Sequence, residues 1–239
     1  MFLAEIFTQL TYGEFAELAI GGKGEGGINP EDFPNVVSHI NLALTELHKR
    51  FPLRTNEILL VQQEGITTYP LKSQYAMMDI VSSEPVRYID DTVRFPFQND
   101  LLKIERILDE VGEEVPLNKL NEENSLFTPS YNVLQIPVTY LNADNTLSII
   151  YRAKHVLIEV TEESDPQTIE VELPPVLLEA LLFYVASRVH SNVPAIEGDT
   201  GEGMRFMAKF EASCQRVTAL GLIAEESNTN MKLEDRGFV

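Results

Sequence analysis

The chain has little cysteine, since Cys214 is the only one in its 239 residues. No intramolecular disulfide can form, which excludes a fold built on the cross-links of oxidising compartments. The first seven residues lack a basic region and include Glu5, so they do not resemble a signal peptide. The most apolar stretch, residues 176–186, is interrupted by Glu179 and is too short to span a bilayer. We therefore expect a soluble protein, intracellular when it is made, with no membrane partner.

Basic residues are also scarce. Lys and Arg number 18 against 37 Asp and Glu, which gives a formal net charge of −19 at pH 7. A surface this acidic repels the phosphate backbone, which argues against DNA binding through charge. The same charge suits the wall of a channel past which DNA slides without adhering. Apolar residues make up 44% of the chain, enough for the core of one large domain or two small ones.

Two helices are predicted near the N-terminus. The first covers residues 1–20 with a break near Gly13, and the second opens at Asn29-Pro30, a capping residue followed by proline, and ends near Arg50. The glycine-rich residues 21–27 between them lack the preceding strand and the Gly-Lys-Ser/Thr sequence of a phosphate-binding loop, which indicates a linker. The second helix has one apolar stripe, made by Val37, Ile40, Leu44 and Leu47.

Short strand-like runs fill the middle of the chain, separated by Asn, Asp, Gly and Pro. Glu64-Gly65 has the sequence of a two-residue hairpin turn between the first two runs. The predicted strands are Glu57–Gln63, Ile66–Leu71, Val86–Ile89, Leu102–Leu108, Glu114–Leu117, Asn132–Ile136, Leu147–Tyr151, His155–Val160 and Thr168–Val171. So many short strands predict an antiparallel sandwich or a small barrel.

The helical pattern returns at Pro174-Pro175. The helix that follows is apolar around much of its girth, which predicts a central place in a bundle. A last helix is expected to end at Leu220, with Gly221 as its C-terminal cap. The apolar face predicted for this last helix consists of Met207, Phe210, Cys214 and Val217. The opposite face consists of Arg205, Lys209 and Arg216.

These elements predict an α+β protein. Residues 1–52 and 173–223 are expected to form a helical bundle from both ends of the chain, and residues 53–172 an inserted antiparallel β-sandwich or barrel domain. Residues 224–239 are expected to form an extended C-terminal tail.

Candidate catalytic residues are few. Asp199-Thr200-Gly201 is the tripeptide of aspartic proteases, but its acidic, glycine-rich surroundings predict a turn between helices. Cys214 and His190 could be a nucleophile and a base, but Cys214 lies on the face predicted to be buried, where a thiol is a small hydrophobe. The histidines have no metal-ligand spacing. They are His39, His48, His155 and His190. We expect no enzymatic activity, no metal and no cofactor.

Two features favour contacts with other proteins. Arg205, Lys209 and Arg216 are either an ordinary solvated helix face or a contact with an acidic neighbour, such as the next copy of this protein. The tail is either a frayed terminus or a segment that orders on a partner, and the apolar residues at its end favour the partner. Its candidate docking residues are Met231, Leu233, Arg236, Phe238 and Val239.

Four segments near the C-terminus form a recognisable series. They are Leu173–Leu181, Ala186-Ser187-Arg188, Pro194–Gly198 and Asn228–Phe238. In this order they resemble a segment from a last strand into a central helix, a small-Ser-Arg element, a short loop before a final helix, and an Asn/Asp-bearing tail. The series is similar to the head-to-tail adaptor proteins of tailed bacteriophages, especially the tail-tube adaptors (tail tubular protein A-like) of short-tailed phages. The glycine-rich residues 21–27 do not belong to that pattern.

The resemblance implies a homo-oligomeric ring, usually of twelve copies, docked beneath the portal protein in the neck of the virion. The helical bundle faces the portal in such proteins, the tail inserts between portal subunits, and the β domain faces the tail or nozzle protein. Genome DNA passes through the lumen without specific binding during ejection. The resemblance implies no catalysis, and a soluble monomer whose tail is disordered until the portal is bound.

Two other classes of function stay open at this point. One is a β-domain binding module, such as a tail or baseplate accessory protein of a virion. The other is a hydrolase that uses the scattered carboxylates, for which the sequence offers no favouring motif.

Overall fold

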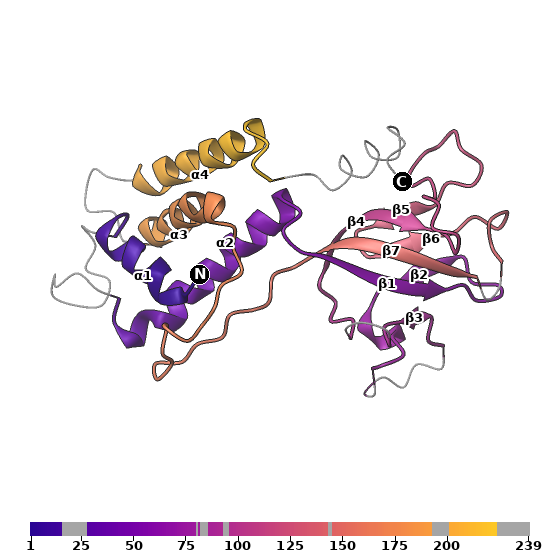
Figure 1. Cartoon of the computed structure of the whole chain (residues 1–239), viewed down its shortest axis with the longest axis horizontal. Helices are drawn as coiled ribbons and strands as arrows, with labels where there is room; N and C mark the ends of the chain where they lie inside the picture. Colours follow the sequence, from indigo (N-terminus) through magenta and orange to yellow (C-terminus); the bar gives the residue numbers. More distant parts are fainter. Residues whose placement is uncertain are drawn as a thin grey trace, which may run out of the picture. The chain divides into compact units, whose positions relative to one another are not determined.

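The structure is a computed structural model that describes residues 1–15, 28–79, 81, 86–92, 96–142, 145–192 and 201–223. Over these residues the protein is α+β, with four α-helices and two antiparallel sheets (Figure 1). Contacts divide the chain into two units: a helical unit, Met1–Leu53 with His155–Val239, and a β unit, Arg54–Lys154. None of the described helices has both the length and the apolar character needed to cross a membrane.

The helical unit contains the helices that the sequence predicts. The first ends at Tyr12, just before Gly13, so the predicted break is confirmed. The second follows a single 3-10 turn that begins at Pro30. The helices and 3-10 turns of the helical unit are α1 (Leu3–Tyr12), η1 (Pro30–Asp32), α2 (Phe33–Arg50), η3 (Pro175–Leu177), α3 (Leu178–Asn192) and α4 (Glu202–Ala219).

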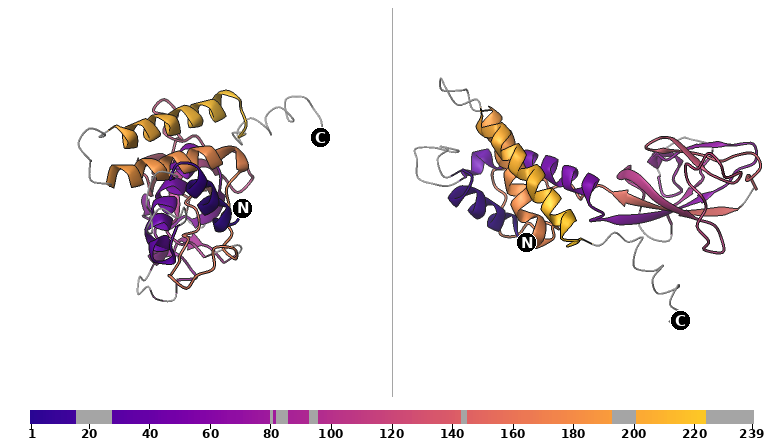
Figure 2. Two further views of the ribbon diagram at one scale, coloured as in Figure 1. Left: turned by 90° about the vertical axis from the view of Figure 1, so that its left-hand side faces the viewer. Right: turned by 90° about the horizontal axis from the view of Figure 1, so that it is seen from above.

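The core of this unit forms around α3. The predicted stripe of α2 is buried, with Ile40 and Leu47 fully inaccessible. α3 packs against each of the other three helices and lies between α2 and α4 (Figure 2). Leu181 and Val185 of α3 are also fully buried, as predicted from the apolar residues around most of the circumference of this helix.

α4 ends in the cap that the sequence indicates. Gly221 has a φ of +61°, a left-handed conformation that glycine adopts without strain. Its N–H donates to the Thr218 carbonyl at 3.0 Å, and the Leu222 N–H donates to the Val217 carbonyl at 3.3 Å. This pair of bonds is the Schellman motif, so the predicted cap is confirmed.

The β unit holds two open antiparallel sheets. One has the order β3-β1-β7-β4 and the other the order β2-β6-β5, and the described strands close no barrel. The strands are β1 (Thr55–Val61), β2 (Thr68–Pro70), β3 (Ile89–Asp90), β4 (Leu101–Leu108), β5 (Phe127–Ser130), β6 (Val133–Gln135) and β7 (Thr146–Ala153), with one 3-10 turn, η2 (Ser73–Tyr75).

Both sheets contribute to a single hydrophobic core. β7 alternates half-buried and buried residues along its whole length, the pattern of a strand with one face inward. Leu60 of β1 and Ile149 of β7 are fully buried, and Tyr69 of β2 and Leu134 of β6 join them from the other sheet. The antiparallel character that the sequence predicts is therefore present.

Glu64-Gly65 does not form the predicted hairpin. Gly65 has a φ of +75°, as a turn requires, but the strands on its two sides belong to different sheets. β1 pairs with β3 and β7, whereas β2 pairs with β6. The predicted turn at Glu64-Gly65 is therefore present, but the predicted pairing of the two strands beside it is wrong. β7, far along the chain, is a longer apolar partner for β1 than β2 is.

Three predicted strands are also wrong. Glu114–Leu117 makes only isolated bridges, through Glu114 and Leu117. Residues 155–160 are extended but pair with no strand, and residues 168–171 make one isolated bridge, between Glu170 and Phe2. The contact division places His155 and the residues after it in the helical unit, whereas the sequence grouped residues 53–172 with the strands.

One strand was missed. β5 contains Pro129, and proline argues against a strand because it cannot donate to the ladder. β5 lies at the edge of its sheet, bonded to β6 alone. A proline at an edge leaves no partner unsatisfied, which is why the residue is tolerated there.

Candidate functional site

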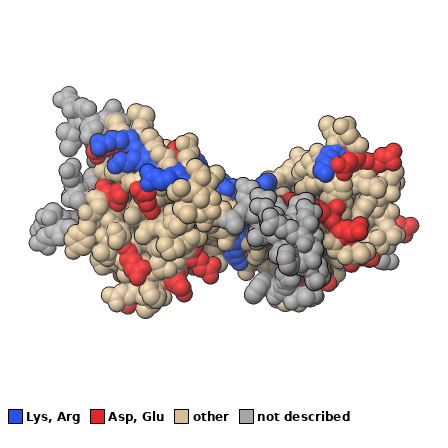
Figure 3. All heavy atoms as spheres, turned by 45° about the horizontal axis from the view of Figure 1, so that its top comes forward, with Lys and Arg blue, Asp and Glu red and all other residues tan. Residues whose placement is uncertain are grey.

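α4 has two chemically distinct faces, as the sequence predicts. Phe210, Cys214 and Val217 are at most 4% exposed and join the core of the helical unit. The basic residues of the helix are all exposed. They are Arg205, Lys209 and Arg216. Lys and Arg side chains gather along the α4 side of the helical unit (Figure 3), which gives this acidic protein one locally basic surface, here called the α4 basic face.

Lys209 is held over aromatic rings of its own unit. Its Nζ lies 4.7 Å from the centroid of the Phe206 ring and 5.2 Å from that of Phe183. Cation–π contacts of this kind contribute about 0.5–1 kcal/mol at exposed sites. They position the ammonium group, and no carboxylate among the described residues pairs with it, so Lys209 stays available to an acidic partner.

Arg216 has an acidic partner within the chain. Its Nη1 lies 3.4 Å from the Oε2 of Glu179 on α3, and the hydroxyl of Ser213 donates to the same oxygen at 3.2 Å. Both charged side chains are more than half exposed, so the pair is weak and easily exchanged. Arg205 differs, because its side chain makes no hydrogen bond or ion pair to any residue that the structure describes.

A third basic contact was not found by sequence reasoning. Arg50, at the end of α2, donates one hydrogen bond from each of Nη1 and Nη2 to the two carboxylate oxygens of Glu211 on α4, both at 2.6 Å. Its guanidinium carbon lies 4.7 Å from the centroid of the Phe210 ring. The Arg50 hydrogen bond lowers the pKa of Glu211. The sequence signal was present only as an arginine in the last turn of a helix, with no indication of its partner.

α4 approaches α3 closely at one glycine. A Cβ atom on Gly203 would lie 2.3 Å from the Ser191 hydroxyl and 3.1 Å from the Ser187 carbonyl, both on α3. Ser187 belongs to the Ala-Ser-Arg element of the sequence, and it is 2% exposed. The small residues on both helices therefore set their spacing at this end, and through it the position of the α4 basic face.

His190 and Cys214 do not form a catalytic pair. The Nε2–H of His190 donates to the Glu14 carbonyl at 3.1 Å, and its Nδ1 lies 3.0 Å from the Oε2 of Glu202. Cys214 is 3% exposed, and burial raises the pKa of its thiol. A buried neutral thiol is a packing residue, and no contact between described residues joins it to His190.

A polar pocket of about 220 Å³ in the β unit was also missed by sequence reasoning. The Tyr151 hydroxyl donates to Oδ1 of Asp100 at 2.9 Å, and the Asn56 amide donates to Oδ2 at 3.0 Å. Burial raises the pKa of Tyr151. Both carboxylate oxygens are satisfied by neutral donors, so the network fixes the start of β4 against β1 and β7 rather than forming an acid–base pair.

Several predicted site residues lie outside the described part of the chain. They are the docking residues Met231, Leu233, Arg236, Phe238 and Val239, together with Asp199 and Thr200. Within the described residues, no group of three or more His, Cys, Asp or Glu side chains is arranged to hold a metal ion.

No protein-family model matches the sequence, and no curated protein matches it.

Proposed function

We propose that this protein is a structural head-to-tail adaptor of a tailed bacteriophage. It forms a ring, of twelve copies in the arrangement that the resemblance implies, which joins the portal protein to the tail and lines the DNA exit channel in the neck of the virion. The observation that carries the proposal is the discontinuous helical unit. Its two chain segments, Met1–Leu53 and His155–Val239, enclose the β unit in the sequence, which is the element order that the resemblance implies.

The proposal assigns a role to each part. The four helices form a bundle that faces the portal, and the two sheets pack as a sandwich that faces the tail or nozzle protein. The tail, residues 224–239, docks on the portal through its apolar anchors. The role is structural and needs no catalysis, and DNA passes the ring without specific binding.

The α4 basic face supports the ring. The protein carries a net charge of −19, so copies repel one another unless a basic surface meets an acidic one. Arg205 and Lys209 keep their charge uncompensated by any acid of the described chain, as shown above. A heterologous contact, in which this face meets an acidic face of the next copy, closes into a ring when the rotation between copies permits it.

Electron microscopy of the chain mixed with its purified portal tests the proposal. A symmetric ring seated on one end of the portal is expected, and its absence at micromolar concentrations of both proteins counts against the adaptor role. Deletion of residues 225–239 should abolish docking while the helical unit keeps its circular dichroism. Docking that survives the deletion would show that the tail is not the docking arm.

Native mass spectrometry tests the ring contact separately. The double substitution Arg205→Glu and Lys209→Glu should weaken the oligomer, because it places acid against acid. Lys119→Glu in the β unit is the control, since Lys119 is exposed and its one ion pair among the described residues is with the exposed Glu122. Equal assembly of the two variants would remove the α4 basic face from the interface.

A further inference from the structure

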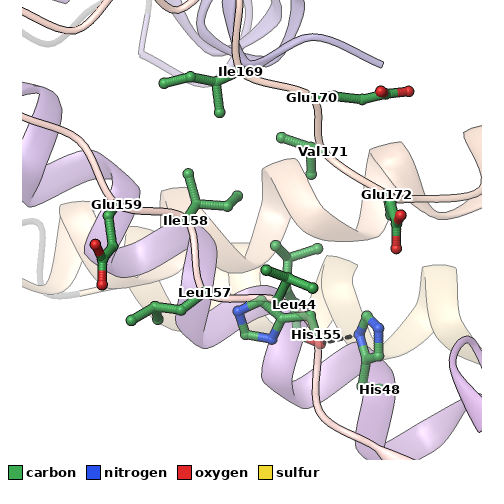
Figure 4. A pocket seen from close by; sticks show the side chains of 11 residues that line it. Leu44, His48, His155, Leu157, Ile158, Glu159, Ile169, Glu170, Val171 and Glu172 are labelled. Atoms are coloured by element: carbon green, nitrogen blue, oxygen red, sulfur yellow. Dashed lines mark hydrogen bonds between the residues drawn. The ribbon is translucent and has the colours of Figure 1, made fainter. Parts of the chain in front are cut away.

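Two extended segments of the helical unit, residues 155–159 and 169–172, form the two arms of a fork (Figure 4). Residues 161–168, which include turns, connect the arms along the chain. Between the two arms lies a pocket of about 270 Å³. It is lined by both arms and by Leu44 and His48 of α2. These arms overlap the segments whose sequences predict strands, and they join neither sheet. The first arm makes no bridge among the described residues, and the second makes one, between Glu170 and Phe2.

The first arm is held along one edge by a side chain. The amide of Asn41 on α2 donates to the Ile158 carbonyl at 2.9 Å and accepts the Ile158 N–H at 3.0 Å. Successive residues of an extended chain direct their backbone groups to opposite edges. Leu157 and Glu159 therefore direct theirs away from Asn41, and their backbone groups make no hydrogen bond to any described residue.

The second arm is held along one edge by the N-terminus. The Leu3 N–H donates to the Ile169 carbonyl at 2.9 Å, and the Val171 N–H donates to the Met1 carbonyl at 2.8 Å. Glu170 and Glu172 direct their backbone groups to the opposite edge by the same alternation. Both line the pocket, and neither makes a backbone hydrogen bond within the described chain.

The fork has an apolar interior and an acidic rim. Ile158 and Val171 are at most 9% exposed and line the pocket from opposite arms. Glu159, Glu170 and Glu172 are exposed at its border, and no lysine or arginine lines it. On the second arm Glu170 and Glu172 lie two residues apart along the unpaired edge, and the first arm adds Glu159. Carboxylates at these positions favour an added strand that carries basic side chains opposite them.

The two histidines of the pocket are engaged within their own unit. The Nδ1–H of His48 donates to the Leu44 carbonyl at 2.8 Å, and the Nε2–H of His155 donates to the Asn41 amide oxygen at 3.0 Å. Their ring centroids lie 5.6 Å apart. They close one end of the fork and leave the two edges as its open surface.

We propose that the fork binds an extended segment of a partner protein, in which apolar residues alternate with lysine or arginine, as a β-strand added between the two arms. Apolar side chains of the segment enter the pocket, its basic side chains meet Glu159, Glu170 and Glu172, and its backbone pairs with the free edges of both arms. This site is distinct from the α4 basic face and does not depend on the adaptor role.

Fluorescence anisotropy tests the proposal on the full chain at about 0.15 M salt, where long-range attraction between exposed charges is screened. The probe is a fluorescein-labelled hexapeptide of alternating valine and lysine, and saturable binding is expected. The matched peptide is N-methylated at alternate residues, which removes the backbone donors of one edge and keeps every side chain. It should bind at least about tenfold more weakly, since it loses several hydrogen bonds. Equal affinity of the two peptides overturns strand addition.

Charge reversal locates the site. The double variant Glu170→Lys and Glu172→Lys should bind the probe at least about tenfold more weakly. The control variant, Glu162→Lys and Glu163→Lys, makes the same charge change at exposed residues in the turn of the same loop. An equal loss in both variants would mean non-specific attraction to an acidic protein and overturns the site.

Two further readouts remain informative if the charge variant folds poorly. In the unaltered protein, bound peptide should slow hydrogen exchange at the amides of Leu157, Glu159, Glu170 and Glu172, and unchanged exchange there overturns the proposal. Deletion of residues 224–239 should leave the affinity unchanged. A tenfold gain on deletion would identify the chain's own tail as the occupant and overturns a partner segment.

Discussion

Strand-like sequence occurs in both units of this protein, with opposite outcomes. In the β unit, β1 and β7 pair over seven residues from Thr55↔Arg152 to Val61↔Thr146. In the helical unit, residues 155–160 and 169–172 have similar apolar, β-branched sequences and form no ladder. The difference shows that the side-chain pattern favours an extended backbone, whereas a β-strand also requires a neighbouring strand with an unpaired edge.

The two regions also satisfy their backbone in different ways. Each central strand of the β unit has neighbours on both edges. Among the described residues each arm of the fork has a partner on one edge. The partner is the side chain of Asn41 for the first arm and residues 1–3 for the second. Solvent can hydrogen-bond the backbone N–H and C=O groups on the other edge of each arm, so an arm can stay extended without a second partner.

The largest expected difference between the two regions comes from replacing one isoleucine in each of them with alanine. Ile149→Ala, on a central strand and fully buried, should cost about 3–4 kcal/mol of the β unit's free energy of unfolding. Ile158→Ala, on an arm and 9% exposed, should cost about half of that in the helical unit. Urea unfolding, followed separately for each unit by hydrogen exchange, measures both. Equal costs would show that the arm is packed as firmly as a paired strand.

The helical unit should be more sensitive at its helix contacts than along its arms. Gly203→Ala should cost about 1–3 kcal/mol, because the added methyl group overlaps the Ser191 hydroxyl and approaches the Ser187 carbonyl. Gly201→Ala is the control, since a Cβ atom there has nothing within 4 Å. Thermal unfolding distinguishes them, and a Gly203 variant as stable as the control would show that α3 and α4 separate readily.

The hold of Asn41 on the first arm is expected to contribute less. Asn41→Ala removes two hydrogen bonds to Ile158 and one to His155, at a cost of about 1–2 kcal/mol, since water replaces part of them. Amide exchange should accelerate at Ile158, whose N–H loses its acceptor, and stay unchanged in β7. Gln167→Ala, in the exposed turn between the arms, serves as the control. Exchange that is unaltered by the loss of Asn41 would mean that packing alone holds the arm.

The smallest effects are expected at the surface ion pairs of α4. Arg50→Ala removes a bidentate contact with Glu211 and a stacked ring, and should cost about 1 kcal/mol. Arg216→Ala, which loses a 3.4 Å contact between two exposed side chains, should cost close to nothing. Chemical denaturation compares the two. A larger cost at Arg216 would show that its 3.4 Å contact with Glu179 stabilises the fold more than the bidentate Arg50–Glu211 contact does.

The sequence predicted helices better than it predicted pairing. The stripe of α2, the apolar girth of α3 and the two faces of α4 each follow from residues within one helix, so local periodicity was sufficient. Glu64-Gly65 shows the limit, because its turn formed while its flanking strands joined different sheets. Pro129 shows another, because an edge position made a proline acceptable where sequence rules reject it.

The site residues also fall into two groups, those that local sequence predicts and those that it does not. The exposure of Arg205, Lys209 and Arg216 follows from helical geometry and was predicted. Glu211 as the partner of Arg50, and Asn41 as the anchor of Ile158, were not predicted, because each joins residues more than a hundred positions apart. Nothing in the local sequence of either residue names its partner.

The sequence by itself determined the α+β composition, the acidic charge, the amphipathic helices and the extended state of the arms, because each depends on propensities and periods within a few residues. Tertiary structure alone decided which extended segments became strands. The rest of the fold must bring an edge to a strand. In this protein the fold brings β1 to β7, whereas one edge of each fork arm has no partner among the described residues.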